Sequence, residues 1–119
     1  MIIVDTSVWI DHFRGPNTAL IAELMTGKVL GHPFVLGELV VGNLHLRHPV
    51  VQVLRELPQA VVADNDEVLT FIDQHGLYRL GLSYVDVHLL ASAQLTPGSR
   101  VWTRDRRFEE VAHRMKLSV

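Results

Sequence analysis

Short apolar runs alternate with longer amphipathic segments along the chain, and this alternation predicts strands separated by helices. Residues 1–4 form an apolar, β-branched run, which is typical of a strand buried on both faces. Further strand candidates are residues 29–30, 60–63 and 101–103, and residues 117–119 are a candidate edge strand. Strands that alternate with helices predict a three-layer α/β/α fold around a mainly parallel sheet of four to five strands.

Turn and capping residues divide the intervening sequence into seven expected helices. These helices span residues 8–14, 18–25, 33–41, 44–57, 64–75, 84–95 and 105–115. The fourth contains Pro49, which weakens the helical pattern there. The fifth opens on acids that suit the N-terminal end of a helix dipole. Its side chains expected to face inward are Val68, Leu69, Phe71 and Ile72.

Composition predicts one globular domain over residues 1–119, because 48% of the residues are hydrophobic and 20% are charged. The sequence contains no cysteine, which excludes a disulfide scaffold, a thiolate metal site and a cysteine nucleophile. No apolar run approaches the roughly 20 residues of a membrane span, and the first residues lack the basic start of a secretory signal. We therefore expect a cytoplasmic protein with no membrane-spanning segment.

Basic residues concentrate near the end of the sequence, although the formal net charge is −2. This group consists of Arg100, Arg104, Arg106, Arg107, Arg114 and Lys116. One explanation is a solvated helix face, and the other is contact with a phosphate backbone. The mildly acidic total excludes only a pervasive basic field, so it is compatible with a nucleic-acid partner.

Two acids directly follow predicted strands. Asp5 comes after residues 1–4, and Asp105 comes after residues 101–103. Ligands of a parallel α/β sheet bind at the carboxyl ends of its strands, so we expect both acids at one edge. Small hydroxyl residues accompany them, namely Thr6, Ser7 and Thr103.

Two further acids stand inside apolar helical segments. Glu38 lies in FVLGELVV, and Asp86 lies in YVDVHLL. A lone carboxylate is costly to bury unless it is paired or bound to a metal, so we expect both to point away from bulk water. Four carboxylates that converge at one strand edge would repel one another. A divalent cation relieves that repulsion, and oxygen ligands favour Mg²⁺ or Mn²⁺ over zinc.

Each acid also has a purely structural explanation. Asp5 and Asp105 can cap the helices that follow them, and Ser83 with Asp86 has the spacing of a capping box. Glu38 can pair with Arg47 or with a nearby histidine. Together these explanations leave two acids inside apolar helices without obvious basic partners.

Four segments that carry these acids resemble a known family. MIIVDTSVWIDHFRG, LGEL, YVDVHLLASA and VWTRDRRF resemble PIN domains, in particular the VapC toxins of bacterial toxin–antitoxin pairs. The resemblance covers essentially the whole chain, with the segments in the same order and spacing. The positions that match the family's acids are Asp5, Glu38, Asp86 and Asp105. Thr103 matches its frequent hydroxyl position, and Thr6 or Ser7 is expected to support Asp5.

The resemblance implies a PIN fold, an acidic pocket that binds Mg²⁺, with Mn²⁺ as a substitute, and cleavage of RNA that inhibits translation. The implied partners are an RNA substrate, a cognate VapB-type antitoxin and a second copy of the chain in a homodimer. Apolar helices around residues 36–46 are a candidate groove for an antitoxin segment. The same pattern is also typical of a helix packed into the core.

The expected reaction is metal-assisted hydrolysis of a phosphodiester by water. Asp5, Asp86 and Asp105 are the expected core ligands of the cation. Glu38 either binds the cation or orients the attacking water. Candidate contacts to the RNA backbone are Arg104, Arg106 and Arg107.

Two other functions fit parts of the pattern. A receiver-type phosphoacceptor module shares the α/β layout and an acidic Mg²⁺ pocket, but it needs a lysine after a late strand. The two lysines, Lys28 and Lys116, do not occupy that place. The other alternative is an inactive PIN-like binding domain, whose usual mark is the loss of acids. The seven histidines show no zinc-site spacing, and most of them are expected to be surface residues or hydrogen-bonded core residues.

Overall fold

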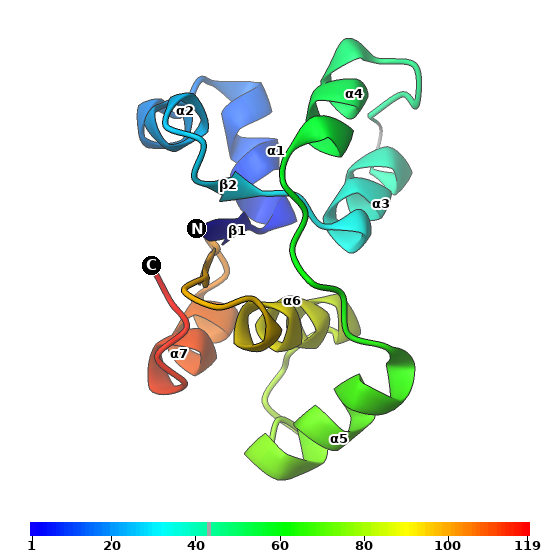
Figure 1. Cartoon of the computed structure of the whole chain (residues 1–119), viewed down its shortest axis with the longest axis vertical. Coiled ribbons are helices and arrows are strands. Elements are labelled where there is room, and N and C mark those ends of the chain that lie inside the picture. Colours follow the sequence, from blue (N-terminus) through cyan, green and yellow to red (C-terminus); the bar gives the residue numbers. More distant parts are fainter. Residues whose placement is uncertain (43) are drawn as a thin grey trace.

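The computed structural model describes residues 1–42 and 44–119, and a short parallel sheet forms its centre (Figure 1). The strands are β1 (Ile2–Val4), β2 (Val29–Leu30) and β3 (Arg100–Trp102), in the spatial order β2-β1-β3. Ile3 is paired with Leu30 on one side and with Val101 on the other. Because all three strands are parallel, their carboxyl ends share one edge of the sheet.

The predicted α/β/α architecture is confirmed, but the predicted number of four to five strands is wrong, since the described residues form three. Single bridges extend the two edges of the sheet. One joins Gly31 to Gln59, and the other joins Val101 to Ser118. Residues 117–119, predicted as an edge strand, therefore contribute only one bridge.

Residues 60–63 were predicted as a strand and do not form one. After the bridge at Gln59, the backbone leaves the sheet, and the Val61 N–H donates to the Thr96 hydroxyl at 3.0 Å. Val61 and Val62 are both exposed. The β-branched side chains of these residues explain why the sequence predicts a strand here. The Val61 N–H, however, bonds to a side chain of another segment and not to a neighbouring strand.

Seven helices surround the sheet in the described chain. They are α1 (Thr6–Arg14), α2 (Thr18–Met25), α3 (Pro33–Val41), α4 (Pro49–Glu56), α5 (Asn65–His75), α6 (Tyr84–Leu95) and α7 (Arg106–Arg114). Six of them agree with the predicted bounds to within two residues. The predicted helix over residues 44–57 is wrong in its first part, because Pro49 opens α4 and His48 caps it.

The helices form two layers around the sheet. In Figure 1, α1 to α4 lie on one side of the sheet, α6 and α7 lie on the other, and α5 packs outside α6. On α5, Val68 and Phe71 are buried, but Leu69 is 53% exposed, contrary to the prediction. The turn of 100° per residue places Leu69 outside the arc that Val68, Phe71 and Ile72 share.

Helix α6 is the most deeply buried helix of the two layers. All of its residues from 87 to 93 are buried, because it lies between the sheet and α5. Each large aliphatic side chain buried there stabilises the fold by roughly 1.5–3 kcal/mol. This packing holds the first turn of α6, which carries Asp86, in a fixed position relative to the strands.

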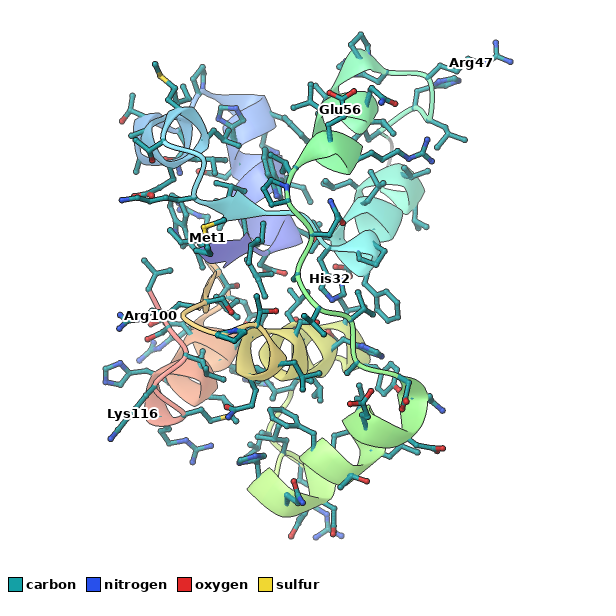
Figure 2. All side chains as sticks on the ribbon, in the orientation of Figure 1. Met1, His32, Arg47, Glu56, Arg100 and Lys116 are labelled. Atoms are coloured by element: carbon teal, nitrogen blue, oxygen red, sulfur yellow. The ribbon has the colours of Figure 1, made fainter. Side chains whose placement is uncertain are left out.

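Charged side chains such as Arg47 and Lys116 extend away from the body of the protein (Figure 2). Among the described residues, no helix combines the length and the apolar character needed to cross a membrane.

Candidate acidic site

Asp5 lies at the carboxyl end of β1, where the strand gives way to α1. It is the N-cap of α1, and only 6% of its surface is exposed. Its Oδ2 accepts hydrogen bonds from the hydroxyls of Ser7 at 2.6 Å and Thr103 at 2.9 Å. The Ser7 N–H is a longer third donor at 3.4 Å. Two hydroxyl donors therefore hold this carboxylate in one orientation.

The same two hydroxyls connect Asp5 to the chain that follows β3. The Ser7 hydroxyl accepts a hydrogen bond from the Arg104 N–H, and the Thr103 hydroxyl accepts one from the Asp105 N–H, both at 3.0 Å. Each hydroxyl thus donates its only proton to Asp5 and receives one from the loop. The ends of β1 and β3 are joined by side chains that are almost a hundred residues apart.

Asp105 follows this loop and caps α7. Its Oδ1 accepts a hydrogen bond from the Phe108 N–H at 2.9 Å. Its side chain is exposed, in contrast to that of Asp5. The predicted capping role of Asp105 is therefore present, and it leaves one carboxylate oxygen available.

Asp86 closes a capping box in the first turn of α6. Its Oδ2 accepts from the Ser83 N–H at 3.0 Å, and its own N–H donates to the Ser83 hydroxyl at 3.1 Å. Partial burial nevertheless raises the pKa of Asp86, and the negative charges of Asp5 and Asp105 raise it further. Three carboxylates are therefore close enough for each ionised partner to disfavour the charge on Asp86.

Glu38 lies on α3, and its surroundings differ from the prediction. The side chain is exposed rather than turned away from water. The apolar residues around it in sequence do not all enter the core, since Val41 on the same helix is 90% exposed. Glu38 Oε1 accepts a hydrogen bond from the Thr6 hydroxyl at 2.7 Å, so its observed partner is neither a basic side chain nor a histidine.

Each of these four carboxylates is held through one oxygen by donors in the described part of the chain. The held oxygens are Oδ2 of Asp5, Oδ2 of Asp86, Oδ1 of Asp105 and Oε1 of Glu38. The second oxygen of each carboxylate has no protein donor among residues 1–42 and 44–119. Such oxygens are the ligands that Mg²⁺ and Mn²⁺ prefer.

The carboxylates do not form a ready cation cage. Within the described residues, no group of three or more acidic or histidine side chains has the geometry to hold a metal ion. Asp5, Asp86 and Asp105 share one electrostatic environment, and Glu38 is connected to the end of β1 through Thr6. In donor type and charge the arrangement suits a divalent cation, because a cation offsets both the burial and the repulsion that raise the pKa of Asp86.

The three candidate RNA-contacting arginines have different environments. Arg104 forms an ion pair with Asp11 at 3.3 Å, and Arg106 forms one with Glu110 at 3.4 Å. Arg107 lies against Gly81, whose positive φ of 77° places it among the backbone conformations that favour glycine. All three are exposed and lie beside Asp105 in sequence.

Two buried histidines were not singled out by the sequence prediction. His32 caps α3 and contacts Ser92, and burial together with the neighbouring His88 lowers the pKa of His32 to about 4. His88 is 3% exposed, and its Nδ1 has no hydrogen-bond partner among the described residues. His88 is therefore an exception to the expectation that most histidines are surface residues or hydrogen-bonded core residues. The sequence signal for His32 was its place directly before Pro33, at the start of a helix.

Comparison with known proteins places this geometry in context. The sequence matches the PIN domain family over residues 2–114. It is similar to two curated proteins named Ribonuclease VapC32, from the CDC 1551 / Oshkosh and ATCC 25618 / H37Rv strains of Mycobacterium tuberculosis. Each is 41% identical over 109 residues, which cover 92% of this chain and 88% of the relative.

Proposed function

The chain belongs to the PIN-domain family, and from that premise we propose that it is a Mg²⁺-dependent endoribonuclease, the toxin of a toxin–antitoxin pair in the cytoplasm. Its substrate is RNA, and cleavage of that RNA inhibits translation. The name of the two relatives, Ribonuclease VapC32, supports the activity. Membership of the family also decides against a receiver-type phosphoacceptor module.

The observation that carries the proposal is the shared environment of three carboxylates at the carboxyl edge of the sheet. The hydroxyls of Ser7 and Thr103 donate hydrogen bonds to Asp5. The charges of Asp5 and Asp105 add to burial in raising the pKa of Asp86. Repulsion between ionised groups is tolerated in a fold chiefly where a function needs it. A divalent cation bound by these acids offsets that repulsion.

In this proposal Asp5, Asp86 and Asp105 hold the cation, with Mn²⁺ able to replace Mg²⁺. When bound, such a cation lowers the pKa of a coordinated water and polarises the scissile phosphate. Ser7 and Thr103 keep the Asp5 carboxylate in place through its Oδ2. The other Asp5 oxygen has no protein donor in the described part of the chain and would be the one to bind the cation.

Glu38 either binds the cation or orients the attacking water. Its hydrogen bond from Thr6 restricts one carboxylate oxygen and leaves the other as an acceptor for water. Thr6 directly follows Asp5 in the chain, so one peptide bond and the hydrogen bond from Thr6 connect the two carboxylates. Water attacks the phosphorus and the bond to the 3′ oxygen breaks, so the products carry a 5′-phosphate and a 3′-hydroxyl.

Arg104, Arg106 and Arg107 are proposed to contact the RNA backbone beside the acids. Arginine donates several N–H groups in a planar fork that matches phosphate oxygens. The ion pairs of Arg104 with Asp11 and of Arg106 with Glu110 are exposed, so each contributes little to stability. Little free energy is therefore lost when Arg104 and Arg106 leave these carboxylates to bind phosphate groups of the RNA.

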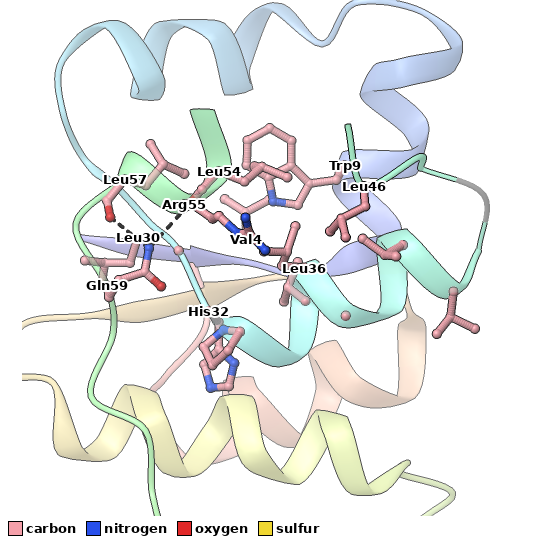
Figure 3. Close-up of a pocket in the computed structure, with 16 residues that line it drawn as sticks. Val4, Trp9, Leu30, His32, Leu36, Leu46, Leu54, Arg55, Leu57 and Gln59 are labelled. Atoms are coloured by element: carbon pink, nitrogen blue, oxygen red, sulfur yellow. Dashed lines mark hydrogen bonds between the residues drawn. The ribbon is translucent and has the colours of Figure 1, made fainter. Parts of the chain in front are cut away.

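A VapB-type antitoxin is the proposed protein partner, and the apolar hollow between α3 and α4 is its proposed docking surface. This hollow has a volume of about 750 Å³ (Figure 3). Its apolar walls include Leu36, Val40, Leu46, Leu54 and Leu57. The predicted groove over residues 36–46 includes Asn43, which lies outside the described residues. A homodimer is also proposed, and light scattering of the purified protein tests it.

Cleavage of a defined RNA by the purified protein, followed by mapping of the new ends, tests the proposed activity. We expect cleavage that EDTA abolishes and that added Mg²⁺ or Mn²⁺ restores. The Asp5→Asn protein, purified in parallel, reports any contaminating nuclease. Full activity of that variant would overturn the site, and failure of the wild-type protein to cleave RNA would favour an inactive PIN-like binding domain.

A further inference from the structure

A buried polar contact joins the start of α3 to the middle of α6. His32 follows β2 at the same edge of the sheet at which Asp5 follows β1 and Thr103 follows β3. The His32 Nε2 lies 2.8 Å from the Ser92 hydroxyl oxygen. His32 is 4% exposed and Ser92 is fully buried, so no solvent competes for this hydrogen bond.

The two nitrogens of His32 have different roles. Nδ1 accepts a hydrogen bond from the Phe34 N–H at 3.1 Å and so caps α3. Because Nδ1 is an acceptor, a neutral imidazole carries its proton on Nε2, which then donates to Ser92. Burial lowers the pKa of His32 to about 4, which keeps the ring neutral at physiological pH.

An aromatic contact continues the same seam between α3 and α6. The rings of Phe34 and His88 have centroids 4.2 Å apart, and Tyr84 meets His88 edge to face at 4.8 Å. From His32 to Phe34 along α3, the partner on α6 therefore changes from Ser92 to His88, one turn nearer the start of α6. The two helices run in opposite directions along this seam, as Figure 3 shows for α3 above α6.

This direction places the part of α3 that carries Glu38 and the first turn of α6, which carries Asp86, at the same end of the seam. Glu38 lies four residues after Phe34, on the same face of α3. The next step along α6 beyond His88 is its first turn, which contains Tyr84 and Asp86. A displacement of α3 along or away from α6 would therefore move Glu38 relative to Asp86.

The choice of residue at position 32 also indicates a second role besides capping. Serine, threonine, aspartate and asparagine are the preferred N-caps of helices. Each of these four residues could accept a hydrogen bond from the Phe34 N–H through its short side chain. None of them is long enough to reach a second partner on α6 at the same time. Histidine satisfies the cap with one nitrogen and reaches Ser92 with the other. Figure 2 shows His32 directed into the space between the two helices.

We propose that His32 is a positioning residue, whose hydrogen bond to Ser92 holds α3 against α6 and thereby sets Glu38 relative to Asp86. This proposal rests on the proposed function of the four carboxylates. His32 touches neither cation nor RNA in it. Its effect on cleavage passes entirely through the placement of Glu38.

Three variants distinguish the hydrogen bond between His32 and Ser92 from the capping of α3 and from a general loss of stability. Ser92→Ala removes the partner of His32 and leaves the cap of α3 intact. His32→Asn keeps a capping oxygen and loses the reach to α6. Ser99→Ala is the matched control, because Ser99 is also buried, near the end of α6, but donates to the carbonyls of Ala93 and Thr96.

The readouts are Mn²⁺ affinity, measured by calorimetry on the protein without RNA, and the rate of RNA cleavage. Loss of a residue that orients metal ligands typically weakens metal affinity or activity about 10- to 100-fold. We expect Ser92→Ala and His32→Asn to lose about 10-fold in at least one readout. We expect Ser99→Ala to stay within about two-fold of wild type, although its urea midpoint falls as well.

A double-mutant cycle with Glu38→Gln decides the mechanism. If Ser92 acts through Glu38, the Ser92→Ala substitution has little further effect in the Glu38→Gln protein. Full additivity of the two losses, or equal losses in Ser92→Ala and Ser99→Ala, would overturn the positioning role alone. Failure of the wild-type protein both to bind Mn²⁺ and to cleave RNA would overturn the proposed function, and this inference with it.

Discussion

The first turns of α5 and α6 are closed by the same motif in two different environments. On α5, Asp64 accepts from the Glu67 N–H at 2.8 Å, and Glu67 accepts from the Asp64 N–H at 2.9 Å. On α6, Ser83 and Asp86 form the equivalent pair of hydrogen bonds, at 3.1 and 3.0 Å. Seen locally, both acids at the third helical position have the same structural task.

The environments of the two boxes separate them. Asp64 and Glu67 are exposed on α5, at the outside of the molecule (Figure 1). Asp86 is partly buried beside Asp5 and Asp105, and burial and these two charges raise its pKa. A capping motif therefore does not reveal whether an acid has a further function. The carboxylates around Asp86 are what distinguish it from Glu67, because such an arrangement costs stability unless a cation binds there.

The largest expected difference between the boxes is in catalysis. Asp86→Asn and Glu67→Gln both keep an oxygen that accepts from the N-cap N–H, so both helices stay capped. We expect Asp86→Asn to reduce the rate of RNA cleavage by at least about 100-fold, because a cation ligand loses its charge. Glu67→Gln should cleave at the wild-type rate. Equal activity of the two variants would erase the proposed distinction.

The second difference is in the response of stability to pH and to cations. Because folding raises the pKa of Asp86, ionised Asp86 lowers the free energy of unfolding at neutral pH. This penalty is relieved as the pH falls through the raised pKa, where the carboxyl becomes neutral. Asp86→Asn should therefore raise the Tm without cations, whereas Glu67→Gln should not.

Cation binding should relieve the same penalty in the wild-type protein. At 100 times the Kd, Mg²⁺ is expected to stabilise the fold by about 2.7 kcal/mol, which thermal melts detect. The gain should shrink as the pH falls through the raised pKa of Asp86, since protons compete with the cation for the carboxylate. An equal Mg²⁺-induced gain in the Asp86→Asn protein would contradict this account.

A smaller difference is expected when the serine or aspartate at the N-cap is removed. Ser83→Ala and Asp64→Ala should each lower the free energy of unfolding by about 1 kcal/mol, measured by urea denaturation. In Ser83→Ala, we also expect slower RNA cleavage, because Asp86 loses part of its fixed orientation. Slower cleavage by Asp64→Ala at matched stability would show that capping alone affects activity.

The smallest expected effect concerns the hydrogen bond between Thr6 and Glu38. Neither side chain is buried, so the hydrogen bond is expected to contribute only about 0.5–1 kcal/mol to holding Glu38 in place. Its loss in Thr6→Val should therefore slow RNA cleavage roughly three-fold. Thr26→Val on α2 is a matched control, because its hydroxyl bonds only to the backbone of its own helix. A ten-fold loss in Thr6→Val would instead indicate that Thr6 itself contacts the reacting groups.

Features that depend on neighbouring residues were predicted well. The bounds of α2, α3 and α6 were predicted, because their caps and turns lie within four residues of the atoms that they satisfy. The prediction of a strand at residues 60–63 was wrong, because the backbone there bonds to Thr96, more than thirty residues away in the chain. The expected burial of Glu38 was wrong for a similar reason. Apolar neighbours in sequence do not show which face of α3 the fold leaves open.

By itself, the sequence determined the order of most strands and helices, the acids at the strand ends and the capping box of α6. These features follow from side-chain type and short-range hydrogen bonds. Only the tertiary structure decided that Ser7 and Thr103 both hold Asp5, that Asp86 lies beside other charges, and that His32 reaches Ser92. Such contacts join residues far apart in the chain. Their energies depend on burial and distance, which no local pattern of residues specifies.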